Sequence, residues 1–298
     1  MKLAPNRHLT IIKFRLNQNL TGPLPGGTFP GSTTLLTVIV TTFNRADIVG
    51  VSVRSALEFV HRIGGNIVLV DDGSSDQTFA QVRREFGGEI ADQSLQCISH
   101  PINRGTTAAK NTGFQHSRGD WVIFLDSDDT LIADSAEPMQ KVLNQQTKTP
   151  VVFFRCVDHN GDFVGLPFDD VQELSLRRYG QFSSYGEALV AMNKTLVQSA
   201  PFDDDLLGYE GLGCARMIKK FGPALLSPIV ARIYNRSRTD RLSTPLGMLR
   251  RAELLARGHL RFVELLGDSL TFNQRFNLRA KAALYYGVGT LFRMIWRR

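Results

Sequence analysis

The chain has 298 residues, of which 43% are hydrophobic, and it carries a formal net charge of +7 at pH 7. This length and composition predict a globular protein with a large core, in one large domain or two small ones. No apolar run approaches the roughly 18 residues of a membrane-spanning helix, and the N-terminal residues lack the apolar core of a secretory signal, so we expect a cytoplasmic protein.

The cysteines and the distribution of charge narrow the possible functions further. Cys97, Cys156 and Cys214 are widely spaced and form no C-x-x-C pair, which argues against a disulfide framework and a zinc site. Residues 250–298 hold ten Lys or Arg against three acids, and residues 1–36 hold four against none, which leaves the middle of the chain at −4. Basic ends suit an anionic membrane surface, whereas an acidic middle argues against nucleic acid, so we expect no nucleic-acid partner.

Strands and helices are predicted to alternate from residue 35, after a Gly- and Pro-rich linker over 17–34. Strands are expected at 35–41, 66–70, 95–99 and 121–125, and helices at 47–62, from a capping box at 74–77 to about 86, and at 106–117. This alternation predicts a parallel, doubly wound sheet. Further on, "VVFFRCV" and "DFVGLPF" flank an Asp-His-Asn-Gly turn that indicates a hairpin and antiparallel pairing, and the chain beyond Arg250 is predicted to be helical and basic.

Acidic side chains follow two of the predicted strands. Asp71 and Asp72 end the second strand, and Asp126, Asp128 and Asp129 end the fourth. Ligands of open parallel sheets bind outside the carboxyl ends of the strands, so both clusters should face one crevice. Converging carboxylates repel one another unless a cation is present, and oxygen ligands favour Mg²⁺ or Mn²⁺ bound together with substrate phosphates. The alternative is that these acids only cap helices and solvate turns.

Four segments, in this order and spacing, resemble the signature segments of the family 2 glycosyltransferases of GT-A fold. They are "VIVTTFNRADIVGVSVRSAL", "IVLVDDGSSDQT", "NRGTTAAKNTGFQHSRGDWVIFLDSDDTL" and "FDDDLLGYEG". The resemblance implies an α/β, Rossmann-like, mostly parallel sheet with an antiparallel acceptor-side portion and a helical basic tail. It divides the chain into a basic extension (1–34), a nucleotide-sugar-binding part (35–130), an acceptor-binding part (131–249) and the tail (250–298).

The resemblance also implies an activity. It is that of a metal-dependent enzyme that transfers a sugar from a nucleotide-diphosphate sugar, with a UDP-type donor favoured, to a glycan acceptor with inversion. We expect a lipid-linked acceptor of bacterial exopolysaccharide, O-antigen or capsule synthesis. The protein would then be cytoplasmic and held through its basic tail at the cytoplasmic face of the inner membrane.

Residues that would bind the nucleotide follow from the same resemblance. Thr41 and Phe43 would line the base pocket, and Asp72, with Asp71 beside it, would read the edge of a uracil-type base. Arg104 and Lys110 lie in the segment that flanks the nucleotide, where a cation would suit the diphosphate. Each could instead be a solvated helix cation.

The metal-binding and catalytic residues are assigned in the same way. Asp126 and Asp128 match the D-x-D motif, the first near the ribose and the second on the metal, with Asp129 an additional acid in that turn. The family usually has Glu-Asp where this chain has Glu210-Gly211, and the Asp is the base. Glu210 is therefore the predicted base. The replacement leaves two alternatives open: a catalytically weak subunit that binds sugar nucleotides, and a nucleotidyltransferase, which shares the acidic metal site.

Overall fold

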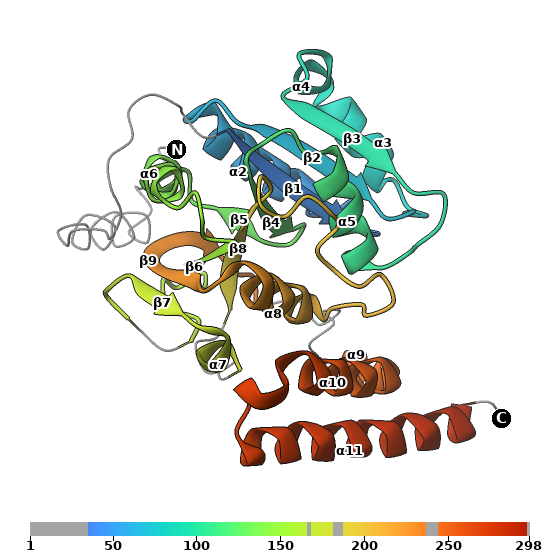
Figure 1. Ribbon diagram of the computed structural model, residues 1–298. Helices are drawn as coiled ribbons and strands as arrows, with labels where there is room; N and C mark the ends of the chain where they lie inside the picture. The colour runs from blue at the N-terminus through green and yellow to red at the C-terminus, as the bar shows by residue number, and fades with distance from the viewer. Residues whose placement is uncertain (1–34, 166–167, 181–186, 237–243, 297–298) are drawn as a thin grey trace.

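A computed structural model describes residues 35–165, 168–180, 187–236 and 244–296 (Figure 1). The predicted linker over 17–34 lies outside the described residues. The described part of the chain forms a nine-stranded sheet in the order β3-β2-β1-β4-β8-β6-β9-β5, with β7 paired to β9.

The first half of the sheet is parallel, as the alternating pattern predicted. Its strands are β1 (Leu36–Thr42), β2 (Asn66–Asp71), β3 (Leu95–Ser99) and β4 (Trp121–Asp126), and its helices are α2 (Val49–His61), α3 (Thr78–Glu85), α4 (Gly87–Ala91) and α5 (Thr106–His116). The predicted capping box before α3 is wrong in detail, because Asp76 rather than Ser74 accepts the hydrogen bond from the Thr78 amide, at 2.9 Å. The Gly87-Gly88 pair begins α4, where the sequence predicted only a stop.

The second half contains the antiparallel portion. Its strands are β5 (Thr130–Leu131), β6 (Val151–Val157), β7 (Gln172–Leu174), β8 (Ala188–Asn193) and β9 (Ala224–Ile233), with helices α6 (Ala136–Gln145), α7 (Leu176–Tyr179) and α8 (Glu210–Phe221). Strand β8 runs antiparallel between β4 and β6, while β6 and β9 are parallel. The predicted hairpin after β6 is reduced to its turn and a single bridge from Val157 to Phe163, because β6 already has β8 and β9 as neighbours.

Two apolar clusters lie on opposite faces of the sheet. Val38 and Val40 of β1 join the cluster under α2 and α6, whereas Ile39 between them joins the cluster under α5 and α8. Successive side chains of a strand point to opposite faces, and a parallel sheet covered on both sides therefore needs a continuous apolar run. The sequence of β1, LTVIVTT, meets that requirement.

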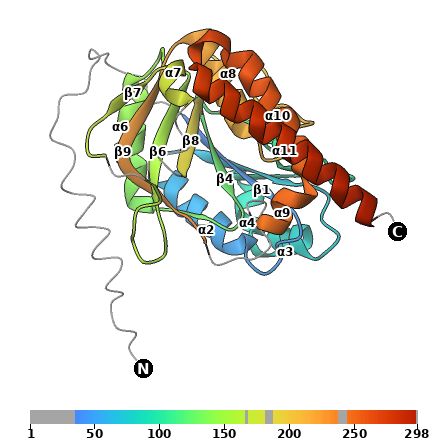
Figure 2. The same cartoon turned by 90° about the horizontal axis from the view of Figure 1, so that it is seen from below.

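The C-terminal residues form three helices on the α8 side: α9 (Pro245–Arg250), α10 (Ala252–Leu266) and α11 (Phe272–Trp296). Helix α10 packs on α8, and α11 packs on α10, which makes α11 the outermost layer of the molecule (Figures 1 and 2). No helix among the described residues combines the length and the apolarity needed to cross a bilayer.

Gly113 allows α5 to pack close to the sheet. Because α5 carries Lys110, this packing sets the position of a candidate site residue. A Cβ atom at Gly113 would come within 2.4 Å of Ile39 Cγ2. We expect Gly113→Ala to lower the free energy of unfolding by about 1–3 kcal/mol in urea denaturation, since overpacking a core forces neighbours to shift. Gly87→Ala is the control, because a Cβ there meets no atom within 4 Å. Equal stability of the two variants would contradict this packing.

Candidate active site

The carboxyl ends of three strands bring the predicted site residues together. Thr41 at the end of β1 pairs with Asp126 of β4 on one side, and Thr42 pairs with Asp71 of β2 on the other. The two acidic clusters therefore lie on one edge of the sheet, separated by a single strand. Thr41 and Thr42 are buried, and within the described part of the chain their hydroxyl oxygens have no hydrogen-bond partner. Phe43 follows directly and is 39% exposed.

Lys110 is the centre of the site. It lies on α5, its side chain is 10% exposed, and its Nζ is 3.0 Å from Asp126 Oδ1 and 3.0 Å from Glu210 Oε1. Asp126 ends β4 and Glu210 begins α8, so one ammonium group joins carboxylates from two segments that are 84 residues apart in the chain. The structure thus brings together the predicted base, the first acid of the D-x-D motif and a predicted diphosphate cation.

Electrostatics favour the charged forms of Lys110 and Asp126. Burial disfavours the charged form of Lys110, but the carboxylates of Asp126 and Glu210 outweigh it and raise the pKa of the ammonium well above its usual range. Burial likewise opposes ionisation of Asp126, and the cations Lys110 and Arg232 outweigh it, so its pKa is lowered. Protonation of Asp126 at neutral pH is therefore disfavoured, and its carboxylate is available to a cation.

The two remaining acids of the D-x-D turn have different surroundings. Asp128 is half-buried, whereas Asp129 is 1% exposed. One Asp129 oxygen accepts the Asn235 amide at 2.8 Å and the other lies 3.1 Å from Arg232 Nη1. Burial raises the pKa of Asp129 to about 7, against the opposing effect of Arg232. These contacts do not support the prediction that Asp129 binds the metal; it holds the turn against β9 instead.

Asp126 and Asp128 remain as candidate ligands of a divalent cation. Among the described residues, no group of three or more His, Cys, Asp or Glu side chains is close enough to form a metal site alone. Asp126 has a side chain that is 42% exposed, and half-buried Asp128 lies two residues away. Two carboxylates fit the way Mg²⁺ is commonly bound, with one or two protein acids and the substrate phosphates.

Asp71 and Asp72 organise the loops beside β2. Asp72 is buried and accepts the amides of Arg104 and Gly105 at 3.0 and 2.6 Å, and His100 Nδ1 lies 2.7 Å from it. Asp71 accepts hydrogen bonds from the amide and hydroxyl of Ser74. Base recognition by Asp72 therefore stays a prediction, because in this structure its oxygens hold the 100–105 loop. The sequence analysis missed His100, although its position directly after β3 places it at the same strand edge.

Glu210 is carried by the loop that precedes α8, residues 201–209, and this loop is fixed by ion pairs. Asp203 pairs with Arg216 at 2.5 Å, Asp204 with Arg104 at 3.0 Å, and Asp205 with Arg261 at 2.8 Å. Each of the three acids therefore faces a cation from another element. Arg104 thus contacts the loop through its side chain and does not reach the Lys110 cluster.

Helix α10 supports the residue before Glu210. The Tyr209 hydroxyl lies 2.8 Å from His259 Nδ1, and the Tyr209 ring packs so closely on Gly258 that an added Cβ would come within 2.7 Å of it. On the other side of Glu210, Gly211 is exposed, and its carbonyl accepts the Tyr179 hydroxyl at 3.0 Å. A Cβ at Gly211 would meet only that hydroxyl, at 3.4 Å. The fold therefore has room for the Asp that the family usually carries here.

Comparison with known proteins assigns this arrangement to a family. The model of the family described as glycosyl transferase family 2 matches residues 37–195, more than half of the chain and the whole span from β1 to just beyond β8. The chain belongs to glycosyltransferase family 2.

Two curated relatives of this glycosyltransferase are named for lipid-linked glycan substrates. A GalNAc(5)-diNAcBac-PP-undecaprenol beta-1,3-glucosyltransferase of Campylobacter jejuni is 25% identical over 84% of this chain and 80% of its own length. The Escherichia coli protein WfgD, a UDP-Glc:alpha-D-GlcNAc-diphosphoundecaprenol beta-1,3-glucosyltransferase, is 25% identical over 56% of this chain and 64% of its own. These relatives support a role in polysaccharide biosynthesis.

Solved structures confirm the GT-A-like fold. Staphylococcus aureus TarS residues 1–349 in complex with UDP align with a TM-score of 0.57 and 17% identity, covering 87% of this chain and 91% of TarS. The mannosyltransferase PcManGT of Pyrobaculum calidifontis, in complex with GDP-Man and Mn²⁺, aligns with a TM-score of 0.60 and 18% identity, covering 96% and 84%. At these identities the likeness establishes the fold alone.

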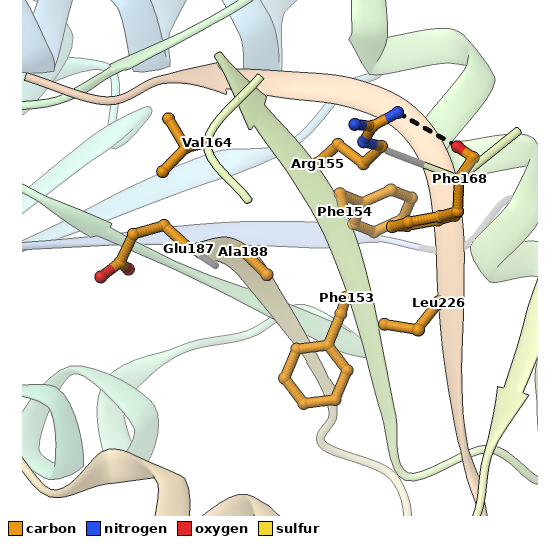
Figure 3. Close-up of a pocket in the computed structure, with 8 residues that line it drawn as sticks. All are labelled: Phe153, Phe154, Arg155, Val164, Phe168, Glu187, Ala188 and Leu226. Carbon is orange, nitrogen blue, oxygen red and sulfur yellow. Dashed lines mark hydrogen bonds between the residues drawn. The ribbon is translucent and has the colours of Figure 1, made fainter. Parts of the chain in front are cut away.

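A narrow pocket of the glycosyltransferase opens in the second half of the sheet. Its lining residues come from β6, β8, β9 and the segments next to them, as Figure 3 shows: Phe153, Phe154, Arg155, Val164, Phe168, Glu187, Ala188 and Leu226. Arg155 donates to the Phe168 carbonyl at 3.1 Å, and its guanidinium lies 3.4 Å from the centre of the Phe163 ring. Glu187 is 3.5 Å from Arg232, the partner of Asp129, so this pocket adjoins the D-x-D turn.

Removing Arg232 should expose the cost of the buried Asp129 charge. We expect Arg232→Met to lower the free energy of unfolding by about 3 kcal/mol or more at pH 8, because an unpaired carboxylate would stay buried. The loss should be smaller at pH 5. A folded-state pKa raised above the unfolded value favours the folded protein at low pH, and this contribution is lost as pH rises through about 7.

The matched control is Arg257→Met, which removes an exposed cation 3.5 Å from Asp205 and should change stability by less than about 1 kcal/mol. Urea denaturation of both variants at pH 5 and pH 8 measures the effects. A loss of stability for Arg232→Met that is larger at pH 5 than at pH 8 would contradict the assignment of Asp129 as a buried, burial-perturbed acid.

Proposed function

We propose that this glycosyltransferase transfers a sugar from a UDP-type nucleotide sugar to a lipid-linked glycan, with inversion and with the help of Mg²⁺ or Mn²⁺, in bacterial surface-polysaccharide synthesis. The observation that carries the proposal is the position of Lys110 between Asp126 and Glu210 at the carboxyl edge of the sheet. A cation, a metal-binding acid and a candidate base meet there, next to the strand ends where ligands of such sheets bind.

The donor would lie across the ends of β1, β2 and β4. The Thr41 hydroxyl, which has no hydrogen-bond partner among the described residues, and the exposed ring of Phe43 suit a nucleotide base, which offers polar edges and a flat face. Asp71 and Asp72 support this pocket from β2, either by reading the base or by holding the loops around it. The diphosphate would lie towards Lys110, where positive charge is already in place.

Asp126 and Asp128 would hold the divalent cation. When bound together with the donor, Mg²⁺ or Mn²⁺ would supply neutralisation of the negative charge that grows on the leaving diphosphate. Lys110 contributes to the same end from α5. Charge stabilisation that increases towards the transition state is the kind that accelerates the chemical step.

Glu210 is the proposed general base. The acceptor oxygen attacks the anomeric carbon from the side opposite the diphosphate, the bond from that carbon to the diphosphate oxygen breaks, and Glu210 takes the hydroxyl proton. In this structure Glu210 Oε1 accepts a hydrogen bond from the Lys110 ammonium at 3.0 Å. A donor diphosphate that attracts the Lys110 ammonium would release this oxygen to accept the proton of the acceptor hydroxyl.

Relatives favour an undecaprenyl-diphosphate-linked acceptor, since two of them are named for such substrates. The protein would meet it at the cytoplasmic face of the inner membrane, in peripheral contact through its basic C-terminal residues. The pocket next to Glu187 and Arg232 is a candidate for part of the acceptor site. Arg155, Phe168 and Glu187 offer an ionic and aromatic lining of the kind that sugars contact.

One alternative has support in the site itself. Gly211 stands where the family usually has its base, and Glu210 is paired with a lysine. A chain that binds sugar nucleotides but transfers weakly would show the same features. Binding and transfer must therefore be measured separately.

The metal site can be tested through binding and turnover together. Calorimetric titration with UDP should give tighter binding with Mn²⁺ than without it, and Asp128→Ala should abolish this difference. The same variant should lower sugar transfer by about a hundredfold or more, because stabilisation of the leaving group is lost. Asp92→Ala, which removes an exposed acid beyond α4, is the control. UDP binding that is independent of Mn²⁺ in the unaltered protein would contradict a metal held by Asp126 and Asp128.

The base is tested by variants at 210 and 211. Glu210→Gln should keep the affinity for UDP within about twofold and lower turnover by about a hundredfold or more, as expected for loss of general base catalysis. Because the fold has room for a side chain at 211, Gly211→Asp in the Glu210→Gln background should restore part of the turnover. Nuclear magnetic resonance of the product would report inversion at the anomeric carbon.

Unchanged turnover in Glu210→Gln would exclude Glu210 as the base. Normal UDP binding with no transfer by the unaltered chain, across a panel of nucleotide sugars and undecaprenyl-linked acceptors, would instead support the weak-subunit alternative. Release of pyrophosphate from a nucleoside triphosphate would indicate a nucleotidyltransferase.

A further inference from the structure

We propose that the outer face of α11 is the surface through which the protein docks on an anionic lipid bilayer. The inference deepens the proposed function, on which it rests for the lipid-linked acceptor, and it identifies the residues that would reach the membrane. We call this surface the α11 outer face. It consists of the large apolar side chains of α11 that are exposed: Phe272, Phe276, Leu284, Tyr286, Leu291 and Met294.

Helix α11 carries half of the large apolar side chains that are exposed in the described part of the chain. Twelve large hydrophobic side chains are exposed among the described residues, and six of them belong to α11. Phe272 is 74% exposed, Phe276 62% and Met294 67%. Single exposed apolar side chains are normal on protein surfaces, but a row of them marks an interaction site.

Five of the six exposed residues lie on the side of α11 that is turned away from α10, and Tyr286 lies on the flank between the two sides. Helical geometry, with 3.6 residues per turn, places Phe276, Leu291 and Met294 on neighbouring lines along one side. Buried Ala282 and Gly289 lie on the opposite side, and a Cβ at Gly289 would come within 2.8 Å of Glu253 on α10. Figures 1 and 2 show α11 as a long helix at the edge of the molecule, with α10 between it and α8. The apolar row therefore faces away from the domain.

Charge favours a membrane as the occupant. The chain after residue 268 contains no Asp or Glu, whereas α11 carries Arg275, Arg279, Lys281 and Arg293. Arg279 and Lys281 are exposed, and Arg275 is half-exposed. An apolar helix face bordered by cations suits the boundary between acyl chains and anionic headgroups, and a helix lying there need not cross the bilayer.

A second copy of the chain fits this face less well. Most soluble homodimers have two-fold symmetry, which brings the same patch of both subunits together. Two α11 helices would then place cations against cations, with no acid on either helix to compensate. Anionic lipid supplies the missing negative charge.

Docking through α11 would position the catalytic loop. Helix α10, which lies directly behind α11, contacts that loop through the Arg261–Asp205 ion pair at 2.8 Å and the Tyr209–His259 hydrogen bond at 2.8 Å. The loop ends at Glu210. A membrane bound to α11 would therefore lie on the same side of the molecule as the loop that carries the proposed base, two helix layers away.

The full-length protein should be tested for flotation with vesicles, without donor or acceptor. We expect binding to vesicles of phosphatidylcholine with about 30% phosphatidylglycerol, and at least about fivefold weaker binding to phosphatidylcholine alone. The variant Phe276→Ser/Leu291→Ser should weaken binding to the anionic vesicles by about tenfold or more, through loss of apolar contact. Arg275→Gln/Arg279→Gln should weaken it by a similar factor and reduce its sensitivity to salt.

Matched controls come from other faces of the molecule. Val51→Ser on α2 removes an exposed apolar side chain, and Arg84→Gln/Arg118→Gln removes two exposed cations. Both should leave vesicle binding unchanged. Circular dichroism and thermal unfolding of each variant would show that the fold is retained.

Absence of binding to anionic vesicles, or equal binding by the α11 variants and the controls, would overturn the proposal. So would sedimentation showing a dimer that Phe276→Ser/Leu291→Ser dissociates, because the face would then bind a second copy. Binding of UDP measured in the same preparations separates this outcome from failure of the proposed function. A protein that binds UDP with Mn²⁺ and ignores vesicles would disprove only the docking surface.

Discussion

The site depends on one buried ammonium group that neutralises two carboxylates from distant parts of the chain. Lys110 can reach both because α5 lies tightly on β1, with Gly113 against Ile39, and because α8 begins directly over α5. Without this cation, Asp126 and Glu210 would repel each other at close range in a partly dehydrated place. The tight packing of α5 on the sheet therefore also places the Lys110 ammonium between the two carboxylates at the strand edge.

A second set of charges determines where Glu210 lies. The three consecutive acids of the 201–209 loop each pair with a cation on a different element: α8, the 100–105 loop and α10. Exposed ion pairs are individually weak. Three pairs that point in different directions nevertheless limit the movement of this short loop in each of those directions. The loop also links the donor side of the site, through Arg104, to the C-terminal helices.

Sequence reasoning predicted the strands and helices of the first half well, because a parallel sheet covered on both faces needs continuous apolar strands and amphipathic helices between them. It also placed both acidic clusters on one edge, which the pairing of Thr41 with Asp126 and Thr42 with Asp71 confirms. Sequence reasoning could not tell that Asp129 is buried against Arg232 while Asp128 is half-buried. The two residues are adjacent in one turn, and only the direction of each side chain separates their surroundings. Nor could sequence reasoning foresee His100 or the partners of Asp203 to Asp205, which depend on contacts between segments tens of residues apart.

The contact between Gly258 and the Tyr209 ring has a practical meaning for work on related proteins. The C-terminal helices lie beyond residues 37–195, the region matched by the family model. Here the removal of α10 would take with it Gly258, His259 and Arg261, which hold the ring and the loop beside the proposed base. In this chain the contacts that hold the loop of the proposed base therefore extend beyond the region matched by the family model, into α10.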